Sequence, residues 1–310
     1  MKKISFLLIV VLIISLICPA FAQTPTYNTG SRQLKVLGNK LVFADDESVE
    51  VHLTGVNVCG SEWMGNPDSE HVKRSIKEAV YNWDCNLIRL GVSLNGWWGR
   101  YSYIRDGGAY YRSYISDVID IVNDTGKYII LDLHEYNYVS QENAQFWREA
   151  AEMFGNNPAV LFGLLNEPCG NITWDTWRNG DGGDNFGMQP LVELIRSKGA
   201  KNILVAGGLS YSGDLRGIVD GYELIDCAPD YDTSKSGYGI MYDAHIYPVH
   251  GDTKTWDSKF GDARRNYPIL IGEFGWDPEA SVVVGTDIPP ESDKYHDKWF
   301  PEIFDWMNDD

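Results

Sequence analysis

The sequence has 310 residues, of which 44% are hydrophobic and 23% are charged, with 31 glycines and 13 prolines. This composition excludes a disordered, collagen-like or coiled-coil chain, and the length suits one large domain as well as two. The 44 acidic and 26 basic residues give a formal net charge of −18. Nucleic acids and membrane surfaces are anionic, so we expect neither as a partner, and a neutral polymer or small neutral ligand fits better.

The chain begins with the pattern of a secretory signal peptide. Lys2 and Lys3 form a basic start, Ile4 to Cys18 is almost wholly apolar, and Ala20-Phe21-Ala22 precedes Gln23. This apolar run is shorter than the roughly 18 residues that a membrane anchor needs. We therefore expect cleavage after Ala22, export of the protein, and a single mature domain over residues 23–310.

A β-hairpin is expected next, and then strands that alternate with helices. The hairpin is predicted from Gln33–Leu41 and Val51–Leu53 about the turn Gly38-Asn39, and we expect it to cap the bottom of the domain. Seven short apolar runs follow: Val51–Asn57, Asn86–Val92, Lys127–Leu133, Ala159–Asn166, Asn202–Ala206, Gly239–Ala244 and Pro268–Gly272. Amphipathic stretches separate or follow them: Glu70–Trp83, Tyr111–Thr125, Gln141–Phe154, Met188–Lys198, Thr255–Arg265 and Tyr295–Asn308. This alternation is typical of βα units and a parallel sheet.

Polar residues gather at the carboxyl ends of the predicted strands. They are Asn57, Arg89, His134, Asn166, Glu167, His245, Tyr247 and Glu273. In a (β/α)8 barrel this end carries the active site. A doubly wound open sheet would normally have a Gly-rich phosphate turn after its first strand, and Gly55-Val56-Asn57-Val58 is not one. We therefore predict an α/β fold of the (β/α)8 barrel type.

The count of strands stops one short of a closed barrel. The seventh run is followed by an excursion over Trp276–Asp293 and by the predicted helix Tyr295–Asn308. An eighth βα unit would need roughly 30 further residues, so we expect the sequence to be truncated at its C-terminus. We expect a gap between the first and seventh strands, with Pro268–Glu273 unpaired on one side. The alternative is an eighth strand formed by residues after Trp276.

Cysteines and possible metal ligands give little support to a cofactor. Cys59, Cys85, Cys169 and Cys227 follow the signal peptide and show no C-x-x-C spacing, which disfavours a structural zinc site. Disulfides and free thiols both stay open, because export permits disulfides. The segment Asp181–Asn185 lacks the spacing of an EF-hand loop, and we expect neither a metal nor another cofactor.

Two carboxylates stand where apolar runs end. Glu167 lies in Leu164-Leu165-Asn166-Glu167-Pro168, and Glu273 lies in Ile271-Gly272-Glu273-Phe274-Gly275. An acid at such a position loses hydration unless it is partnered, so the placement indicates a structural or a functional role. The strands that carry them place the pair on opposite sides of a barrel mouth. Facing carboxylates in a chain rich in Trp and Tyr are typical of glycoside hydrolysis, with one acid protonating the leaving oxygen and one carboxylate attacking.

A resemblance supports this interpretation. The residues Arg89, His134, Asn166-Glu167-Pro168, His245-Ile246-Tyr247 and Glu273-Phe274-Gly275 resemble the cellulase-like members of glycoside hydrolase family 5, in clan A. The resemblance implies a retaining (β/α)8 enzyme with Glu167 as acid/base and Glu273 as nucleophile. It also implies that Arg89 and Tyr247 orient the nucleophile, and that His134, Asn166 and His245 bind sugar or tune the acid. The family pattern includes a Trp after the eighth strand, for which this sequence has no candidate in the right place.

Aromatic residues near strand ends are candidates for stacking on sugar rings. Trp63 and Trp276 are the best placed, although each could instead pack in a loop or the core. We predict a secreted, monomeric endo-β-glycanase that hydrolyses β-1,4-glucan. A β-mannanase, another β-glucanase of the same fold, and a non-catalytic carbohydrate-binding protein are the alternatives. A serine hydrolase is disfavoured because no G-x-S-x-G motif occurs.

Overall fold

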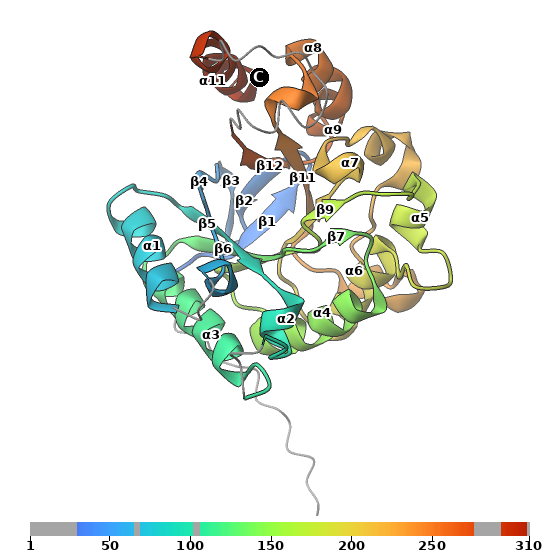
Figure 1. Ribbon diagram of the computed structural model, residues 1–310. Coiled ribbons are helices and arrows are strands. Elements are labelled where there is room, and N and C mark those ends of the chain that lie inside the picture. The colour runs from blue at the N-terminus through green and yellow to red at the C-terminus, as the bar shows by residue number, and fades with distance from the viewer. Residues whose placement is uncertain (1–29, 65–68, 102–105, 276–292, 309–310) are drawn as a thin grey trace, which may run out of the picture.

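The computed structural model describes residues 30–64, 69–101, 106–275 and 293–308 (Figure 1). The predicted signal peptide and Trp276 lie outside these ranges, as does the side chain of Trp63. No helix in the described ranges is both long and apolar enough to cross a membrane. Cys59, Cys85, Cys169 and Cys227 are free thiols, and all but Cys59 are buried.

A seven-stranded sheet forms the centre of the molecule (Figure 1). Its strands are β4 (Gly55–Val58), β5 (Leu87–Val92), β6 (Tyr128–Leu133), β8 (Val160–Gly163), β10 (Leu204–Gly207), β11 (Ile240–Ile246) and β12 (Ile269–Phe274). Each strand pairs in parallel with the next one of this series. They match the seven predicted runs in order, which confirms the predicted βα alternation and the barrel architecture.

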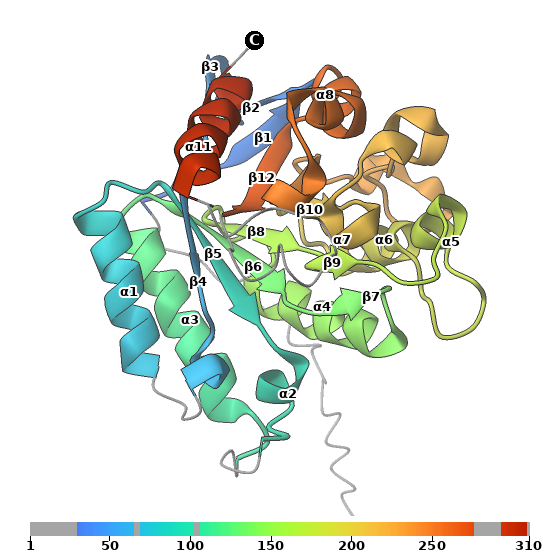
Figure 2. The same ribbon diagram turned by 45° about the horizontal axis from the view of Figure 1, so that its top comes forward.

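Helices follow one another around the outside of the sheet (Figure 2). The main ones are α1 (Ser69–Tyr81), α3 (Ala109–Asp124), α4 (Gln141–Phe154), α6 (Met188–Ser197) and α11 (Asp293–Asn308). Short helices are α2 (Leu94–Trp97), α5 (Trp174–Asn179), α7 (Leu209–Ser212), α8 (Thr253–Trp256) and α9 (Asp262–Arg264). The 3-10 and π turns are η1 (Ser61–Met64), η2 (Ile218–Tyr222), η3 (Pro229–Tyr231), η4 (Thr233–Lys235), η5 (Pro248–His250) and η6 (Asp257–Gly261). The bounds of α4 agree with the prediction, because Ser140 and Asn143 form a capping box at its start.

The N-terminal hairpin is a three-stranded antiparallel sheet of β1 (Leu34–Leu37), β2 (Lys40–Phe43) and β3 (Asp46–Glu50). The turn at Gly38 is where it was predicted, with a left-handed φ of 62°. The prediction that Val51–Leu53 forms the returning strand is wrong: β2 returns from the turn and pairs with β1. The polar and exposed β3 then pairs with β2, since it uses backbone hydrogen bonds and needs no buried face. Leu34 and Leu41 pack in one cluster with inward-facing side chains of the parallel strands, so the hairpin closes the bottom of the barrel.

The parallel sheet is open between β4 and β12. The two strands stand at opposite ends of the strand order, and no strand follows β12 in the described part of the chain. The residues of β4 are exposed or half-buried, whereas all but one residue of the neighbouring β5 are buried. A cavity of about 920 Å³ lies at this opening, lined by β4, β12 and α11. The predicted gap between the first and seventh strands is therefore confirmed for the described residues.

Candidate active site

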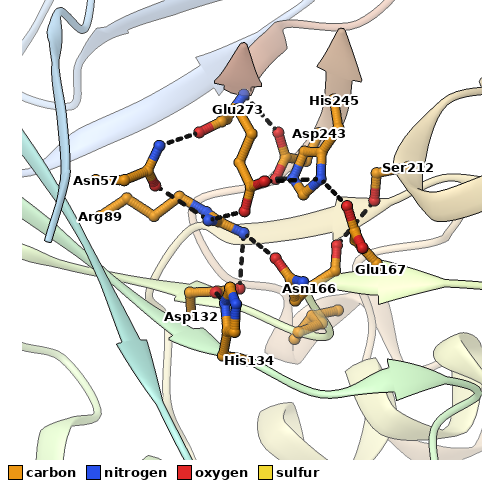
Figure 3. Close-up of polar contacts among 12 residues, drawn as sticks. Asn57, Arg89, Asp132, His134, Asn166, Glu167, Ser212, Asp243, His245 and Glu273 are labelled. Carbon is orange, nitrogen blue, oxygen red and sulfur yellow. Dashed lines mark hydrogen bonds and ion pairs between the residues drawn. The ribbon is translucent and has the colours of Figure 1, made fainter. Parts of the chain in front are cut away.

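Two glutamates face each other at the carboxyl ends of the strands (Figure 3). Glu167 follows β8 in the two-residue strand β9 (Glu167–Pro168), which pairs with β7 (Tyr136–Asn137). Its backbone N–H donates to the carbonyl of Glu135 at 3.2 Å, so the main chain that carries this acid is fixed. Glu273 lies near the end of β12, and one carboxylate oxygen of each residue lies within 4.8 Å of the other.

A β-bulge turns Glu273 toward the inside of the barrel. Ala244 pairs with Ile271, but the next residue, His245, pairs with Glu273, so Gly272 is an extra residue in β12. Leu270 belongs to the inner cluster, and strict alternation would place Gly272 inside and Glu273 on the helix side. The extra residue reverses the alternation, and Glu273 joins the inward-facing set.

Arg89 connects the two carboxylates to the rest of the site. Its Nη1 donates to Glu273 Oε1 at 2.7 Å and to Asn57 Oδ1 at 3.0 Å. Its Nη2 donates to Asn166 Oδ1 at 2.6 Å and lies 3.1 Å from Asp132 Oδ1. Burial alone would lower the pKa of Arg89, but the acids around it raise that pKa, so the guanidinium stays charged.

Three neighbours keep Glu273 ionised. Arg89 and the hydroxyl of Tyr247 donate to its two oxygens, the latter at 2.8 Å to Oε2. The Nδ1 atom of His245 lies 3.6 Å from Oε2. Burial raises the pKa of Glu273, but His245, Arg89 and Tyr247 lower it by more, and the net pKa lies below the usual range. An ionised carboxylate suits a nucleophile.

His245 is fully buried and lies between acidic groups. Its Nδ1 is 2.8 Å from Glu167 Oε1, and its Nε2 is 3.4 Å from Asp243 Oδ2. Burial alone would lower the pKa of His245, but Asp243, Glu167 and Glu273 raise it to about 9. The imidazole is therefore positively charged at neutral pH.

One cluster of side chains among the described residues could hold a metal ion. Glu167, His245 and Glu273 each offer a ligand atom, and these atoms lie within 4.8 Å of one another. The 2.8 Å contact between Nδ1 of His245 and Oε1 of Glu167 is a hydrogen bond, which accounts for their closeness without an ion.

The remaining predicted polar residues lie around this pair. Asn166 is buried, its Oδ1 accepts from Arg89, and its Nδ2 has no hydrogen-bond partner among the described residues. His134 follows β6, and its Nδ1 lies 2.7 Å from Asp132 Oδ2. The structure thus brings Arg89, His134, Asn166, Glu167, His245, Tyr247 and Glu273 to one end of the sheet, whereas Trp63 and Trp276 are outside what is described.

Two acids of the site, Asp132 and Asp243, escaped the sequence analysis. Each is buried within an apolar strand and stands two residues before a site histidine, in Asp132-Leu133-His134 and Asp243-Ala244-His245. Because strand side chains alternate with period two, an acid at this spacing lies on the same face as the histidine. The repeated D-x-H pattern is the signal that predicts them.

Exposed aromatic rings border the pair. Tyr136 is 45% and Tyr211 is 55% exposed. Burial chiefly, and the charges of Glu167 and Glu273, raise the pKa of Tyr136, while Cys169 chiefly, and Glu167, raise that of Tyr211. Tyr211 lies in a left-handed turn in which three consecutive non-glycine residues, Ser210 to Ser212, have positive φ. Such strain is typical of functional loops.

Comparison with known proteins gives a consistent result. A family model described as cellulase, glycosyl hydrolase family 5, matches residues 44–310. Endoglucanase 5 from Pectobacterium carotovorum subsp. carotovorum is 25% identical over 310 residues, covering 96% of this chain and 54% of that relative. Endoglucanase N from Pectobacterium atrosepticum is also 25% identical over 310 residues, covering 96% of this chain and 61% of that relative. The chain thus spans about half to three fifths of the length of these relatives.

Solved structures share the fold. A β-glucanase from Saccharophagus degradans has a TM-score of 0.69 at 24% sequence identity, covering 89% of this chain and 81% of that chain. The catalytic domain of an endoglucanase from Thermobifida fusca has a TM-score of 0.57 at 18% identity, covering 78% of this chain and 73% of that chain. At these identities the likeness establishes the fold alone.

Proposed function

The chain belongs to the cellulase family, glycosyl hydrolase family 5, and on that premise we propose that it is a retaining endo-β-glycanase that hydrolyses β-1,4-glucan. One observation carries the proposal. Glu167 and Glu273 extend from different strands to within 4.8 Å of each other. Retaining glycosidases have carboxyl groups about 5–5.5 Å apart, whereas inverting ones leave room for a water at about 6.5–9.5 Å.

The environments of the two acids suggest their roles. Glu273 is held ionised by Arg89 and Tyr247 and attacks the anomeric carbon. Glu167 gives its proton to the glycosidic oxygen as the bond from carbon to that oxygen breaks, and a glycosyl ester forms on Glu273. Water then enters, Glu167 takes one of its protons, and the oxygen attacks the anomeric carbon. The ester bond breaks, and Glu273 leaves as a carboxylate.

The other polar side chains position these groups and the sugar. Asn166 precedes Glu167 in the chain, and its amide Nδ2 makes no hydrogen bond to a described residue. This Nδ2 can therefore donate to a sugar hydroxyl. His245 donates to Glu167 Oε1, which leaves Oε2 of that acid for the proton in transfer. The exposed rings of Tyr136 and Tyr211 offer surfaces on which sugar rings stack.

The choice of β-1,4-glucan rests on relatives. The two Pectobacterium proteins are named endoglucanases, and the β-glucanase from Saccharophagus degradans has been crystallised with cellotetraose. We further propose that residues 1–22 are a signal peptide, that residues 23–310 form one catalytic domain, and that the exported protein is a monomer.

A panel of soluble polysaccharides tests the proposal. We expect the purified protein to release reducing ends from carboxymethylcellulose and mixed-linkage β-glucan faster than from galactomannan, xyloglucan or β-1,3-glucan. Viscosity should fall well before many ends appear, because an endo-acting enzyme cuts within chains. Proton NMR should show the β-anomer first, as retention requires. Faster cleavage of galactomannan would indicate a β-mannanase, and binding to glucan without cleavage would indicate a carbohydrate-binding protein.

A further inference from the structure

Two side chains stabilise the bulge at Gly272 by binding its backbone N–H and its backbone carbonyl. The backbone N–H of Gly272 donates to Asp243 Oδ1 at 2.8 Å. Its carbonyl accepts from Asn57 Nδ2 at 2.9 Å. An extra residue in a bulge loses its ladder hydrogen bonds, and a buried N–H without a partner is costly. Asp243 replaces the ladder bond at the residue that turns Glu273 inward.

Gly272 and Asp243 fit each other closely. A Cβ atom added at Gly272 would lie 2.3 Å from Asp243 Oδ1 and 2.5 Å from Oδ2. The φ of Gly272 is not in the left-handed region, so backbone conformation alone does not require glycine there. Glycine is needed because the carboxylate occupies the space of the side chain.

The other oxygen of Asp243 faces the histidine beside the second carboxylate. Asp243 Oδ2 lies 3.4 Å from His245 Nε2, which has no hydrogen-bond partner among the described residues. The opposite nitrogen, Nδ1, contacts Glu167 Oε1 at 2.8 Å. His245 thus lies between Asp243 and Glu167, and the three side chains are seen in this order in Figure 3.

We propose that Asp243 is a positioning residue for both carboxylates of the pair. Through Oδ1 it stabilises the bulge that aims Glu273, and through Oδ2 it holds His245 as a cation that orients Glu167. The positive imidazolium stabilises the carboxylate that forms on Glu167 as its proton leaves. The inference rests on the proposed function and adds to it a residue that never touches substrate.

Three substitutions separate the roles of the two carboxylate oxygens of Asp243. In Asp243→Asn, the amide oxygen still accepts from Gly272, and the amide NH2 then faces His245 Nε2. Two donors cannot face each other, so His245 must lose its proton from Nε2. Asp243→Ala removes both contacts, and Gly272→Ala displaces the carboxylate while leaving Asp243 in the sequence. The three variants are compared on β-glucan and on dinitrophenyl cellobioside, whose leaving group needs little protonation.

A matched control lies beside the start of the strand that carries Asp243. Asp226 accepts from the backbone N–H groups of Gly237 and Gly239, just before β11 begins and at the opposite end from His245. Asp226 also accepts from Nε of the buried Arg196 at 2.5 Å. Asp226→Asn therefore weakens a carboxylate that binds backbone and an arginine without touching the site. We expect the rates of this variant on β-glucan and on dinitrophenyl cellobioside to stay within about twofold of those of the parent protein, even if the variant is less stable.

The loss of rate on each of the two substrates should distinguish the variants. For Asp243→Asn we expect a loss of about 100-fold on β-glucan but less than about 10-fold on dinitrophenyl cellobioside, because Glu273 stays in place. For Asp243→Ala and Gly272→Ala we expect about 100-fold losses on both substrates, because Glu273 is misplaced. Equal losses on both substrates for Asp243→Asn, or rates within about twofold of the parent for Asp243→Asn and Gly272→Ala, would overturn the proposal.

A spectroscopic measurement is independent of activity. Charged or titratable groups near His245 are Asp243 on its own strand, Glu167, Glu273 and His250. Nitrogen NMR of labelled histidine should show both nitrogens of His245 protonated at neutral pH in the parent and Nε2 unprotonated in Asp243→Asn. An unchanged spectrum would refute the contact. A parent that cleaves neither substrate but shows this change would refute the proposed function and leave the role of Asp243 at His245 standing.

Discussion

Asn57 on β4 donates a hydrogen bond from Nδ2 to the backbone carbonyl of Gly272 on β12, at 2.9 Å. These strands are the two edges of the open sheet, so one side chain spans the opening that backbone pairing leaves. The Oδ1 of the same amide accepts from Arg89, which in turn donates to Glu273. The opening of the barrel and the geometry of the candidate nucleophile therefore depend on one residue.

Replacing Asn57 by alanine should weaken both stability and catalysis. The carbonyl of Gly272 and one N–H of Arg89 lose their partner, which should lower the free energy of unfolding by about 1–3 kcal/mol. The rate on β-glucan should fall by roughly 10-fold, since Glu273 loses support on one side. Urea denaturation and initial rates measure the two effects.

Asn39→Ala is the control for that substitution. Asn39 also donates to a backbone carbonyl, that of Arg264, but it is exposed and lies in the hairpin. We expect a change within about 0.5 kcal/mol and no change in rate. If Asn57→Ala behaves like Asn39→Ala, the side chain does not hold the two edges together.

Alanine substitutions at the two glutamates should have different consequences. Glu273→Ala should abolish activity on every substrate, because no glycosyl ester can form. Glu167→Ala should retain activity on dinitrophenyl cellobioside, and added azide should raise its rate by replacing the water that this variant can no longer activate. Product analysis should then show a β-glycosyl azide. Identical behaviour of the two variants on the activated substrate would mean that the assigned roles are wrong or reversed.

Arg89 and Tyr247 both donate to Glu273, but we expect their contributions to the rate to differ. Tyr247→Phe removes one hydrogen bond to a charged oxygen, worth about 1.5–3 kcal/mol, so the rate should fall by roughly 10- to 100-fold. Arg89→Lys should cost more, since one ammonium cannot reach Glu273, Asn166 and Asp132 in the fork geometry of a guanidinium. Comparing kcat for both variants tests this order. A milder effect of Arg89→Lys would show that only charge matters at this position.

Local periodicity made much of this fold predictable from the sequence. The strands β5, β6, β8, β10 and β11 show as apolar runs because both of their faces are covered, and α4 begins at a capping motif. Polar residues at the ends of such runs stand out for the same reason, which is why Glu167 and Glu273 were found.

Features that depend on pairing between distant segments could not be predicted. The bulge at Gly272 is visible only once β12 is aligned with β11, and simple alternation would turn Glu273 away from the site. Asp132 and Asp243 lie inside strands, where apolar runs and their ends give them no distinction, so only their spacing of two residues from His134 and His245 marks them in the sequence. The strand β3 was missed because an exposed edge strand carries no apolar pattern.

His245 makes the stability of the fold depend on pH. Burial alone would lower the pKa of His245, but the acids around it raise the pKa from 6.5 to about 9. Folding therefore favours the protonated form. This contribution is fully present below pH 6.5 and is lost as the pH rises through about 9. A tenfold difference in proton affinity between the folded and unfolded states corresponds to about 1.4 kcal/mol, so the contribution is of the order of 3 kcal/mol.

We therefore expect the free energy of unfolding of the parent to fall by roughly 3 kcal/mol more than that of His245→Gln between about pH 6 and about pH 10. Glutamine keeps an amide that can donate to Glu167 but cannot take up a proton, so the difference between the two proteins isolates this titration. Urea denaturation at a series of pH values measures it, and the alkaline limb of the rate on β-glucan should follow the same midpoint. A difference between parent and variant that stays constant across this range would mean that His245 carries no charge in the folded protein, and the acids around it would then need another partner.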